Sequence, residues 1–211
     1  LENGIFAIGF FMFAYRTLLT HNVVQVSHEI FKTTVVPGDT VIDATCGNGN
    51  DSLFLARLLQ GEGRLVVYDI QKEALSNALL LFETHLSEQE RSVIEMKEQS
   101  HEHILEKDVK LIHYNLGYLP KGNKEITTLA RTTEISLEYA LNIVRPDGLI
   151  TVVCYPGHPE GEKETHSVES LAQRLHPKEW CVSSFYVANR CRAPRLFIFQ
   201  RQGSESSVDK G

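Results

Sequence analysis

The chain has 211 residues and an apolar fraction of 42%, which suits one globular domain with a sizeable core. Its formal charge of −6 argues against a broad electrostatic attraction to nucleic acid, so any RNA contact would have to come from a local basic face. The four cysteines have no C-x-x-C spacing, which argues against a zinc site or a disulfide framework and favours reduced thiols in the cytoplasm.

The N-terminal region is apolar from Ile5 to Tyr15. This run is too short to cross a bilayer, and it lacks the preceding positive charge of a secretory signal. We expect residues 1–20 to be an extension or a helix packed on the domain, although residues ahead of Met12 could also reflect the choice of start site. Residues 21–203 are predicted to form the single domain, residues 204–211 a flexible tail, and no membrane association is expected.

Strands and helices are predicted to alternate along the chain. A helix over 21–34 precedes predicted strands at 40–45, 64–69, 92–97, 109–114, 149–155, 181–188 and 195–200, and further helices are expected at 51–59, 72–85 and 132–144. Such alternation indicates an α/β fold whose parallel sheet has helices on both faces. The short connection before the last strand indicates an antiparallel hairpin.

The first predicted strand ends in an acid, Asp43, and runs into a turn that contains Gly47 and Gly49. Glycines allow a tight turn and close approach of a ligand to the backbone. A dinucleotide fold would require a third glycine where this chain has Ser52, so the NAD fingerprint fails. The pattern instead favours the S-adenosylmethionine site of a Rossmann-like class I methyltransferase, with Asp43, Gly47 and Asp51 as candidate cofactor-binding residues. The alternative is an ordinary junction between a strand and a helix.

The second predicted strand ends at Asp69, 22 residues after Gly47. This is about where a nucleotide-binding βαβ unit places a carboxylate on the ribose hydroxyls. Asp69 is therefore the predicted ribose ligand; alternatively it caps the following helix, or it does both.

Ser100 and His101 follow the third predicted strand, where class I enzymes contact the adenine of the cofactor. They are predicted to bind the cofactor, although His101 could instead begin a helix or lie on the surface. His103 lies close by, but no third ligand is apparent and we predict no metal site.

The fourth predicted strand leads into Asn115-Leu116-Gly117-Tyr118, where amino-group methyltransferases carry an N-P-P-aromatic loop. An attacking amine must be held by acceptors that aim its lone pair, and an aromatic ring can stack on a base. Asn115 is the predicted acceptor and Tyr118 the predicted stacking residue. The match is partial, since the two prolines are missing, and the alternative is a structural exit from the strand with Tyr118 in the core.

The loop after the fifth predicted strand is rich in proline and glycine and could form a lid or wall of the same cleft. Its His158 could accept a proton from the attacking ammonium, although a lone loop histidine is more often solvated. Basic residues in the final hairpin and in the loop after Tyr118 could meet RNA phosphates, or could be solvated surface charges: Arg190, Arg192, Arg195, Lys121, Lys124 and Arg131.

These motifs together resemble the MnmM family over about residues 24–200. The shared patterns are D-A-T-x-G-N-G-N-D, D-I-Q, S-H, N-L-G-Y-L-P-x-G-x-K-x-I-T-T and Y-P-G-H-P-E-G. The resemblance implies S-adenosylmethionine-dependent N-methylation of 5-aminomethyl-2-thiouridine at the tRNA wobble position, with the anticodon stem-loop as partner. By the same motifs, Asn48, Asn50 and Gln71 look like further cofactor contacts. Asn123 departs from the family, since many relatives have an acid there.

Three other functions remain open from the sequence. The same cofactor motifs would serve a methyltransferase for rRNA or small amines, or a non-catalytic S-adenosylmethionine-binding RNA module. An NAD-dependent oxidoreductase is disfavoured by Ser52. A homodimer is neither required nor excluded.

Overall fold

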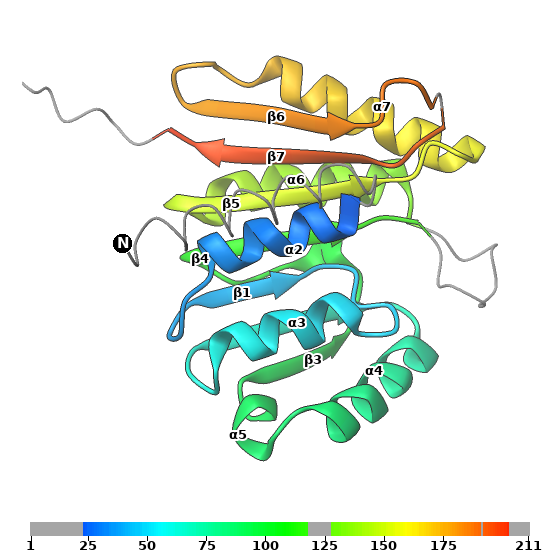
Figure 1. Ribbon diagram of the computed structural model, residues 1–211. Coiled ribbons are helices and arrows are strands. Elements are labelled where there is room, and N and C mark those ends of the chain that lie inside the picture. Colours follow the sequence, from blue (N-terminus) through cyan, green and yellow to red (C-terminus); the bar gives the residue numbers. More distant parts are fainter. Residues whose placement is uncertain (1–22, 118–127, 191, 203–211) are drawn as a thin grey trace, which may run out of the picture.

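The computed structural model describes residues 23–117, 128–190 and 192–202 (Figure 1). Seven strands in this part of the chain form one sheet: β1 (Thr40–Asp43), β2 (Arg64–Asp69), β3 (Ile94–Glu98), β4 (Val109–Asn115), β5 (Val144–Cys154), β6 (Trp180–Tyr186) and β7 (Arg195–Arg201). The helices are α2 (Val23–Thr34), α3 (Asn50–Leu59), α4 (Lys72–His85), α5 (Glu88–Arg91), the 3-10 helix η1 (His101–His103), α6 (Ala130–Ile143) and α7 (Pro159–Arg174).

The sheet reverses its strand order beside β1. The order is β3-β2-β1-β4-β5-β7-β6, so the chain builds outward first to one side of β1 and then to the other. In register, Ile42 of β1 pairs with Val66 of β2 and with Ile112 of β4, and all three strands are parallel. In open α/β sheets, ligands bind outside the carboxyl ends of the strands at such a reversal.

The last strand, β7, runs antiparallel between β5 and β6. Residues 187–194 connect β6 to β7, which is too short for a parallel crossover. The prediction of a mostly parallel sheet with an antiparallel last strand is confirmed.

Helices cover both faces of the sheet, as predicted (Figure 1). Successive strand residues point to opposite faces, so Val41 packs with Phe31 of α2 and Leu55 of α3, whereas Ile42 belongs to the cluster that includes Leu137 of α6. Both strand residues are fully buried. The parallel strands therefore contribute to two cores at once, which explains their nearly continuous apolar runs.

The chain contains a long helix, α7, that the sequence analysis did not predict. The run from Pro156 to Gly161 was expected to form a loop because of its prolines and glycines. In the structure Pro159 is the first residue of α7, a position where no backbone N–H is needed and where the fixed φ of proline suits a helix. The short α5 and η1 were also not predicted, and β5 begins at Val144 rather than at 149.

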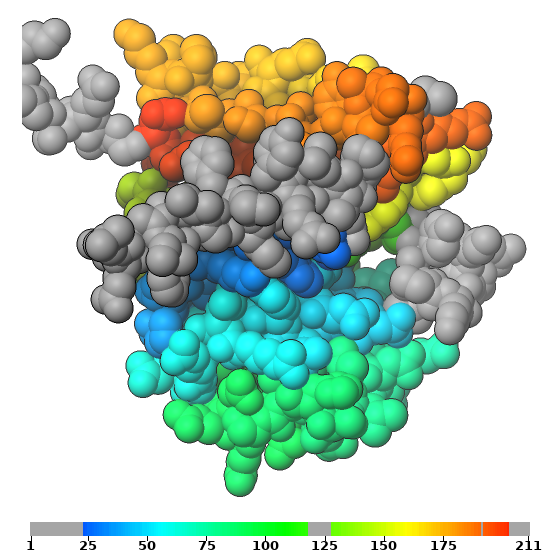
Figure 2. All heavy atoms as spheres, viewed as in Figure 1, coloured from blue at the N-terminus to red at the C-terminus, as the bar shows by residue number. Residues whose placement is uncertain are grey.

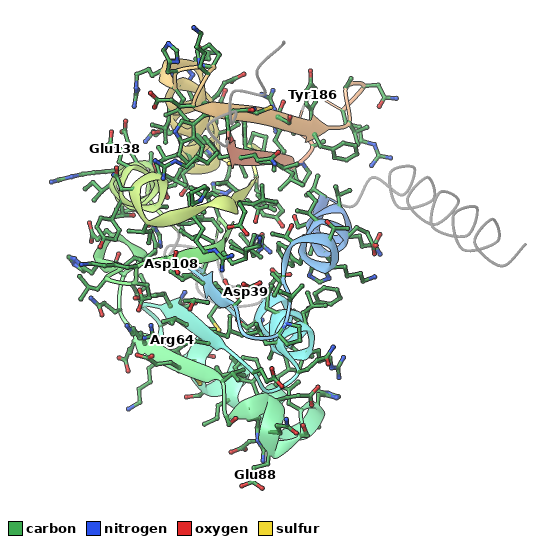
Figure 3. The ribbon with its side chains drawn as sticks, turned by 90° about the vertical axis from the view of Figure 1, so that its left-hand side faces the viewer. Asp39, Arg64, Glu88, Asp108, Glu138 and Tyr186 are labelled. Atoms are coloured by element: carbon green, nitrogen blue, oxygen red, sulfur yellow. The ribbon has the colours of Figure 1, made fainter. Side chains whose placement is uncertain are left out.

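The amino-terminal edge of the sheet is held by ion pairs. Arg145 Nη1 lies 3.1 Å from Asp39 Oδ1, and Arg64 Nε donates to Glu95 Oε2 over 2.9 Å. Figure 3 shows Asp39 and Arg64 in this region. Figure 2 shows α5 and the β6–β7 hairpin at opposite ends of the molecule.

The predicted N-terminal extension and C-terminal tail lie outside the described residues. Within the described part of the chain, no helix is both long and apolar enough to cross a membrane.

Candidate active site

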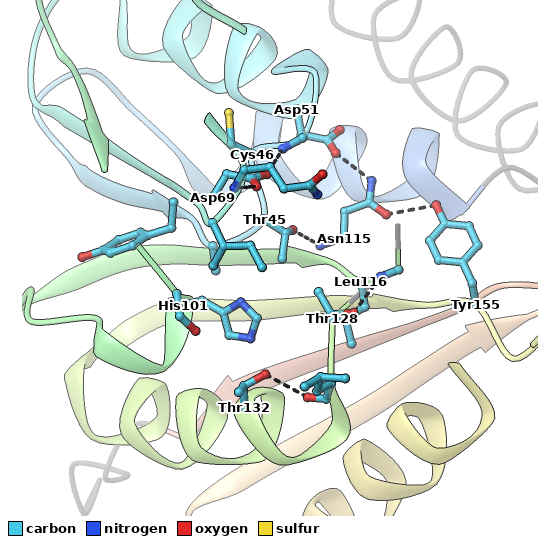
Figure 4. A pocket seen from close by; sticks show the side chains of 18 of the residues that line it. Thr45, Cys46, Asp51, Asp69, His101, Asn115, Leu116, Thr128, Thr132 and Tyr155 are labelled. Carbon is cyan, nitrogen blue, oxygen red and sulfur yellow. Dashed lines mark hydrogen bonds between the residues drawn. The ribbon is translucent and has the colours of Figure 1, made fainter. Parts of the chain in front are cut away.

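A cavity of about 930 Å³ opens at the carboxyl edge of the sheet, beside the reversal of strand order (Figure 4). It is lined by the turn after β1, the ends of β2, β4 and β5, the segment after β3 and the first turn of α6. The candidate site residues were predicted to follow the ends of successive strands. Most of them line this one cavity: Gly47, Asn48, Asn50, Asp51, Asp69, Gln71, Ser100, His101, Asn115 and His158.

The turn after β1 uses its two glycines for different purposes. Gly47 lines the cavity and has a φ of 52°, which glycine adopts readily. Because glycine has no Cβ, a ligand can approach its backbone closely. Gly49 has φ of 82°, but a Cβ there would lie 2.7 Å from Cβ of Ala78 on α4. The close neighbour that requires glycine at position 49 is therefore a helix, rather than the ligand that the sequence analysis expected.

Asp43 lies beneath this turn and is fully buried. Its carboxylate accepts hydrogen bonds from Thr45 N (3.1 Å) and from Ser52 Oγ (2.5 Å). Burial is the main cause that raises the pKa of Asp43 to about 6. Because its side chain does not line the cavity, the geometry favours a role in holding the turn over the direct cofactor contact expected from the sequence. Ser52, which replaces the third glycine of a dinucleotide fold, is part of that support.

Asp69 connects the end of β2 to the turn after β1. Its Oδ2 accepts from Gly47 N and its Oδ1 from Gln71 N, each over 2.8 Å. Burial raises the pKa of this carboxyl group. The cap position of α4 is occupied by Gln71, so the alternative that Asp69 is the cap residue is wrong. Asp69 lines the cavity while it fixes the backbone on both sides.

His101 lies across the cavity from this turn (Figure 4), and Ser100 lines the cavity beside it in the chain. Ser100 caps η1 through its hydroxyl. His101 is the first residue of η1, so the alternative that it begins a helix is confirmed. The alternative that it lies on the surface is wrong, since His101 is only 7% exposed. Burial lowers the pKa of His101 to about 4, so the ring is neutral at physiological pH. Its Nε2 has no hydrogen-bond partner among the described residues. No group of three potential metal ligands gathers in the described part of the chain.

Asp51 is the centre of a hydrogen-bonded network between α2, α3 and β4. Its Oδ1 lies 2.6 Å from Nε2 of His28, which stacks on Phe54 with ring centroids 4.1 Å apart. Its Oδ2 accepts from Asn115 Nδ2 (2.9 Å) and lies 3.4 Å from Nε2 of the fully buried His113. These partners outweigh burial and hold the pKa of Asp51 far below its usual value. Both carboxylate oxygens are thus occupied by protein groups.

Asn115 is fixed at three points. Its backbone N–H donates to Thr45 Oγ1 over 2.7 Å, its Nδ2 donates to Asp51, and its Oδ1 accepts from Tyr155 Oη over 3.0 Å. Tyr155 follows β5 and lines the cavity. Burial is the main cause that raises the pKa of Tyr155 to about 12.

Residues 117 and 128 flank a segment that lies outside the described residues, and they are joined by two hydrogen bonds. Gly117 N donates to Thr128 Oγ1 over 2.8 Å, and Thr128 N donates to Gly117 O over 3.0 Å. Tyr118, the predicted stacking residue, lies in that segment, as do Lys121 and Lys124. Thr128 and Thr132 line the cavity and were not predicted.

His158 lines the cavity as the N-cap of α7. Its Nδ1 accepts from Gly161 N over 3.1 Å, so the lone pair of the neutral ring is directed at the helix. Proton transfer to His158 would require that lone pair. This cap was not predicted, because α7 itself was not predicted.

The arginines of the β6–β7 hairpin occupy different positions. Arg192 is exposed and lines the cavity. Arg195 Nη1 lies 3.7 Å from Glu169 Oε2, and its guanidinium lies over the ring of Tyr186. Arg190 is exposed. Arg192 alone of these three borders the cavity.

His28, His113 and the role of Tyr155 were not predicted from the sequence. A histidine between the apolar residues Ile112 and Tyr114 of β4 was a usable signal for His113, since a buried polar side chain needs a partner. No local pattern marks His28, which lies 23 residues before its partner Asp51.

Comparisons with known proteins identify relatives of this chain. A model of the family described as "Putative rRNA methylase" matches residues 65–201. The Arabidopsis thaliana protein "tRNA (mnm(5)s(2)U34)-methyltransferase, chloroplastic" is 36% identical over 189 residues, covering 84% of this chain and 69% of that protein. A crystal structure of a "putative rRNA-methylase" from Clostridium thermocellum has a TM-score of 0.80 at 33% identity, covering 85% of this chain and 97% of that one.

A "putative methyltransferase" from Streptococcus mutans, solved in complex with SAH, has a TM-score of 0.74 at 23% identity and covers 84% of this chain and 97% of that one. At this identity the likeness concerns the fold alone. Together with the Clostridium thermocellum structure, it confirms the predicted Rossmann-like methyltransferase fold.

Proposed function

Because the chain belongs to the family described as putative rRNA methylases, we propose that it is an S-adenosylmethionine-dependent tRNA methyltransferase. The substrate would be 5-aminomethyl-2-thiouridine at the wobble position, and the product 5-methylaminomethyl-2-thiouridine. The resemblance to the MnmM family is confirmed, and the name of the Arabidopsis thaliana relative describes this wobble position. The observation that carries the proposal is one cavity lined by Asp69, Ser100 and His101 on one side and by the hydrogen-bonded Asn115 and Tyr155 on the other.

The residues at the first end fit S-adenosylmethionine. Asp69 presents a carboxylate at the end of β2, and we assign it to the ribose hydroxyls, with Gln71 beside it. His101 presents a buried, neutral Nε2 without a partner among the described residues, and we assign it to the adenine with Ser100. The turn from Gly47 to Asn50 would receive the methionine part, with Asp43 and Asp51 supporting it from below.

When bound, the cofactor supplies a methyl group already activated on a sulfonium. The protein then has mainly to position the amine, and positioning alone can lower a barrier by several kcal/mol. Asn115 is held between Asp51 and Tyr155, and we assign it to the amine end of the cavity. Tyr118 is retained as the proposed stacking residue.

His158 is retained as a wall residue near the amine. Its use as a proton acceptor has less support, because protonation at Nδ1 would break the cap of α7. The methylated ammonium can release its proton to water instead.

We infer that the anticodon stem-loop approaches the open side of the cavity. Arg192 lines the cavity on a chain of net charge −6, so it offers a local contact for a backbone phosphate. A cytoplasmic location agrees with the unpaired state of Cys46, Cys154 and Cys181.

The test is methyl transfer from labelled S-adenosylmethionine to bulk tRNA from a strain lacking this gene, followed by nucleoside mass analysis. Gain of label on 5-aminomethyl-2-thiouridine supports the proposal. Binding of the cofactor without transfer to tRNA would contradict it, and rRNA and small amines would be tested next. Binding without transfer to any acceptor would indicate a non-catalytic RNA module.

A further inference from the structure

The polar network of the cavity ends at a tyrosine hydroxyl. We propose that Oη of Tyr155 accepts a hydrogen bond from the attacking amine and so makes Tyr155 a catalytic residue of the methyl transfer. This inference rests on the proposed function and adds a residue that binds the nucleophile. It is carried by the direction of the hydrogen bonds from Asp51 through Asn115 to Tyr155.

The direction is set by the charge on Asp51. His113 at 3.4 Å, His28 at 2.6 Å and Asn115 at 2.9 Å hold its carboxylate in the ionised form, which can only accept hydrogen bonds. The Asn115 amide must therefore turn its NH₂ group toward Asp51. Its carbonyl oxygen then faces Tyr155.

The orientation of Asn115 in turn sets the role of the tyrosine hydroxyl. Since Oδ1 of Asn115 is an acceptor, the 3.0 Å contact requires Tyr155 to donate its only hydroxyl proton. Burial and the nearby charge of Asp51 raise the pKa of Tyr155 to about 12, so this proton stays in place at neutral pH. The lone pairs of Oη are thereby left to accept from a third group.

The ring of Tyr155 is held in place by its surroundings. It packs against the apolar cluster of Val23, Val153 and Leu196, which joins α2, β5 and β7. Gly117 lies beside the ring, since a Cβ there would be 3.7 Å from Cδ2 of Tyr155. Figure 4 shows the hydroxyl directed at Asn115 on the cavity wall. A fixed hydroxyl can orient a ligand without further loss of conformational entropy.

This geometry suits a primary amine as nucleophile. An acceptor for one N–H leaves the nitrogen lone pair free to point at the methyl carbon. In the transfer the lone pair forms the new N–C bond, the electron pair of the broken C–S bond stays on sulfur, and the ammonium releases a proton to water. The positive charge that develops on nitrogen is favoured by a hydrogen-bonded chain that ends in the Asp51 anion.

The test compares Tyr155→Phe with the wild-type chain in single-turnover reactions at saturating S-adenosylmethionine and tRNA. The ring and its packing remain, and only the hydroxyl is lost. We expect the rate to fall between about tenfold and a hundredfold while the cofactor Kd changes by less than about twofold. Tyr186→Phe is the matched control, because Tyr186, labelled in Figure 3, is an exposed tyrosine on β6 that does not line the cavity. It should react at the wild-type rate.

A second variant, Asp51→Asn, tests the direction of the chain. Its amide can donate or accept, so Asn115 would no longer be forced to present its oxygen to Tyr155. We expect a similar loss of rate, and the double variant should lose less than the product of the two single losses.

Three results would overturn the inference. They are a Tyr155→Phe rate within about threefold of wild type, a loss of cofactor binding or folding that accounts for the lower rate, and fully multiplicative losses in the double variant. If the wild-type chain methylates no tRNA, the proposed function fails and the inference falls with it. If the wild type is active and Tyr155→Phe is equally active, only the assignment of Tyr155 fails.

Discussion

The two ends of the cavity are built differently. At the cofactor end, carboxylates hold backbone N–H groups: Asp43 binds Thr45 N and Asp69 binds Gly47 N. At the substrate end, side chains from separate elements hold one another, as Tyr155 holds Asn115 from 40 residues away. The proposed cofactor end is thus built within one strand-helix-strand unit, from β1 to β2, whereas the proposed substrate end joins α3 to β4 and β5 and depends on the register of more of the sheet.

The largest expected effect is at the junction of the two ends. Asn115→Ala removes the link between Asp51 and Tyr155 and leaves an anion without one of its donors. We expect methyl transfer to fall on the order of a hundredfold to a thousandfold, with cofactor affinity changed much less. Single-turnover kinetics and calorimetric titration would measure the two effects. Asn142→Ala, on the exposed side of α6, is the control; equal losses in both variants would contradict the assignment.

The buried carboxyl at the cofactor end should make stability depend on pH. The pKa of Asp43 is raised from 3.8 to about 6, so the folded state holds this proton more tightly than the unfolded state does. The contribution of this bound proton to the free energy of unfolding is fully present below about pH 4 and is lost as the pH rises through about 6. Relative to Asp43→Asn, the wild-type chain should therefore lose up to roughly 3 kcal/mol between pH 4 and pH 7.

Urea unfolding of both proteins across this pH range would check the Asp43 prediction. A difference between the two proteins that stays constant with pH would show that Asp43 ionises normally in the folded state.

Asp69→Ala tests the cofactor end directly. It removes the predicted ribose ligand and releases Gly47 N and Gln71 N. A charge-assisted hydrogen bond is worth roughly 1.5 to 3 kcal/mol, so the Kd for S-adenosylmethionine should rise at least about tenfold. Asp147→Ala removes an exposed carboxylate that pairs with Lys110 and should leave the Kd unchanged. Unchanged binding by Asp69→Ala would remove Asp69 from the cofactor site.

The smallest predicted effect concerns RNA alone. Arg192→Glu should raise the KM for tRNA about tenfold and lower its dependence on salt, because one phosphate contact is lost. The cofactor Kd should not change. Arg201→Glu makes the same change of charge at the opposite end of β7 and provides the control. If both variants behave alike, the effect reflects net charge, and Arg192 makes no specific contact.

Much of the fold could be predicted because its signals are local. Buried parallel strands read as apolar runs, and the helix predicted over 72–85 has the observed bounds of α4. Helix α7 was missed because its start contains Pro159 and Gly161, residues that usually interrupt a helix but are tolerated in its first turn.

The site residues also divide into those with a local signal in the sequence and those whose contacts depend on the fold. Asp69 and His101 could be placed in the cavity from their positions after strands, since parallel strands bring their carboxyl ends to one edge. Tyr155 was treated as part of a loop, because its bond to Asn115 depends on the register of β4 against β5. Asn115 was found, but its partners Asp51 and Tyr155 could not be inferred from the residues next to it.

The reversed direction of β7 has a consequence for how this protein can change over evolution. Because β7 runs antiparallel to β5, it begins at the edge of the sheet where β5 ends. The connection before β7 therefore reaches the edge that holds the cavity, and its Arg192 lines the cavity. A parallel strand would instead have placed the connection after it at that edge. Both strands that flank the connection before β7 pair along their length with fixed partners. Insertions there could remodel the rim that is proposed to contact RNA, while the sheet register and the proposed cofactor end stay as they are. New acceptor preferences could therefore arise without loss of the methyl donor site.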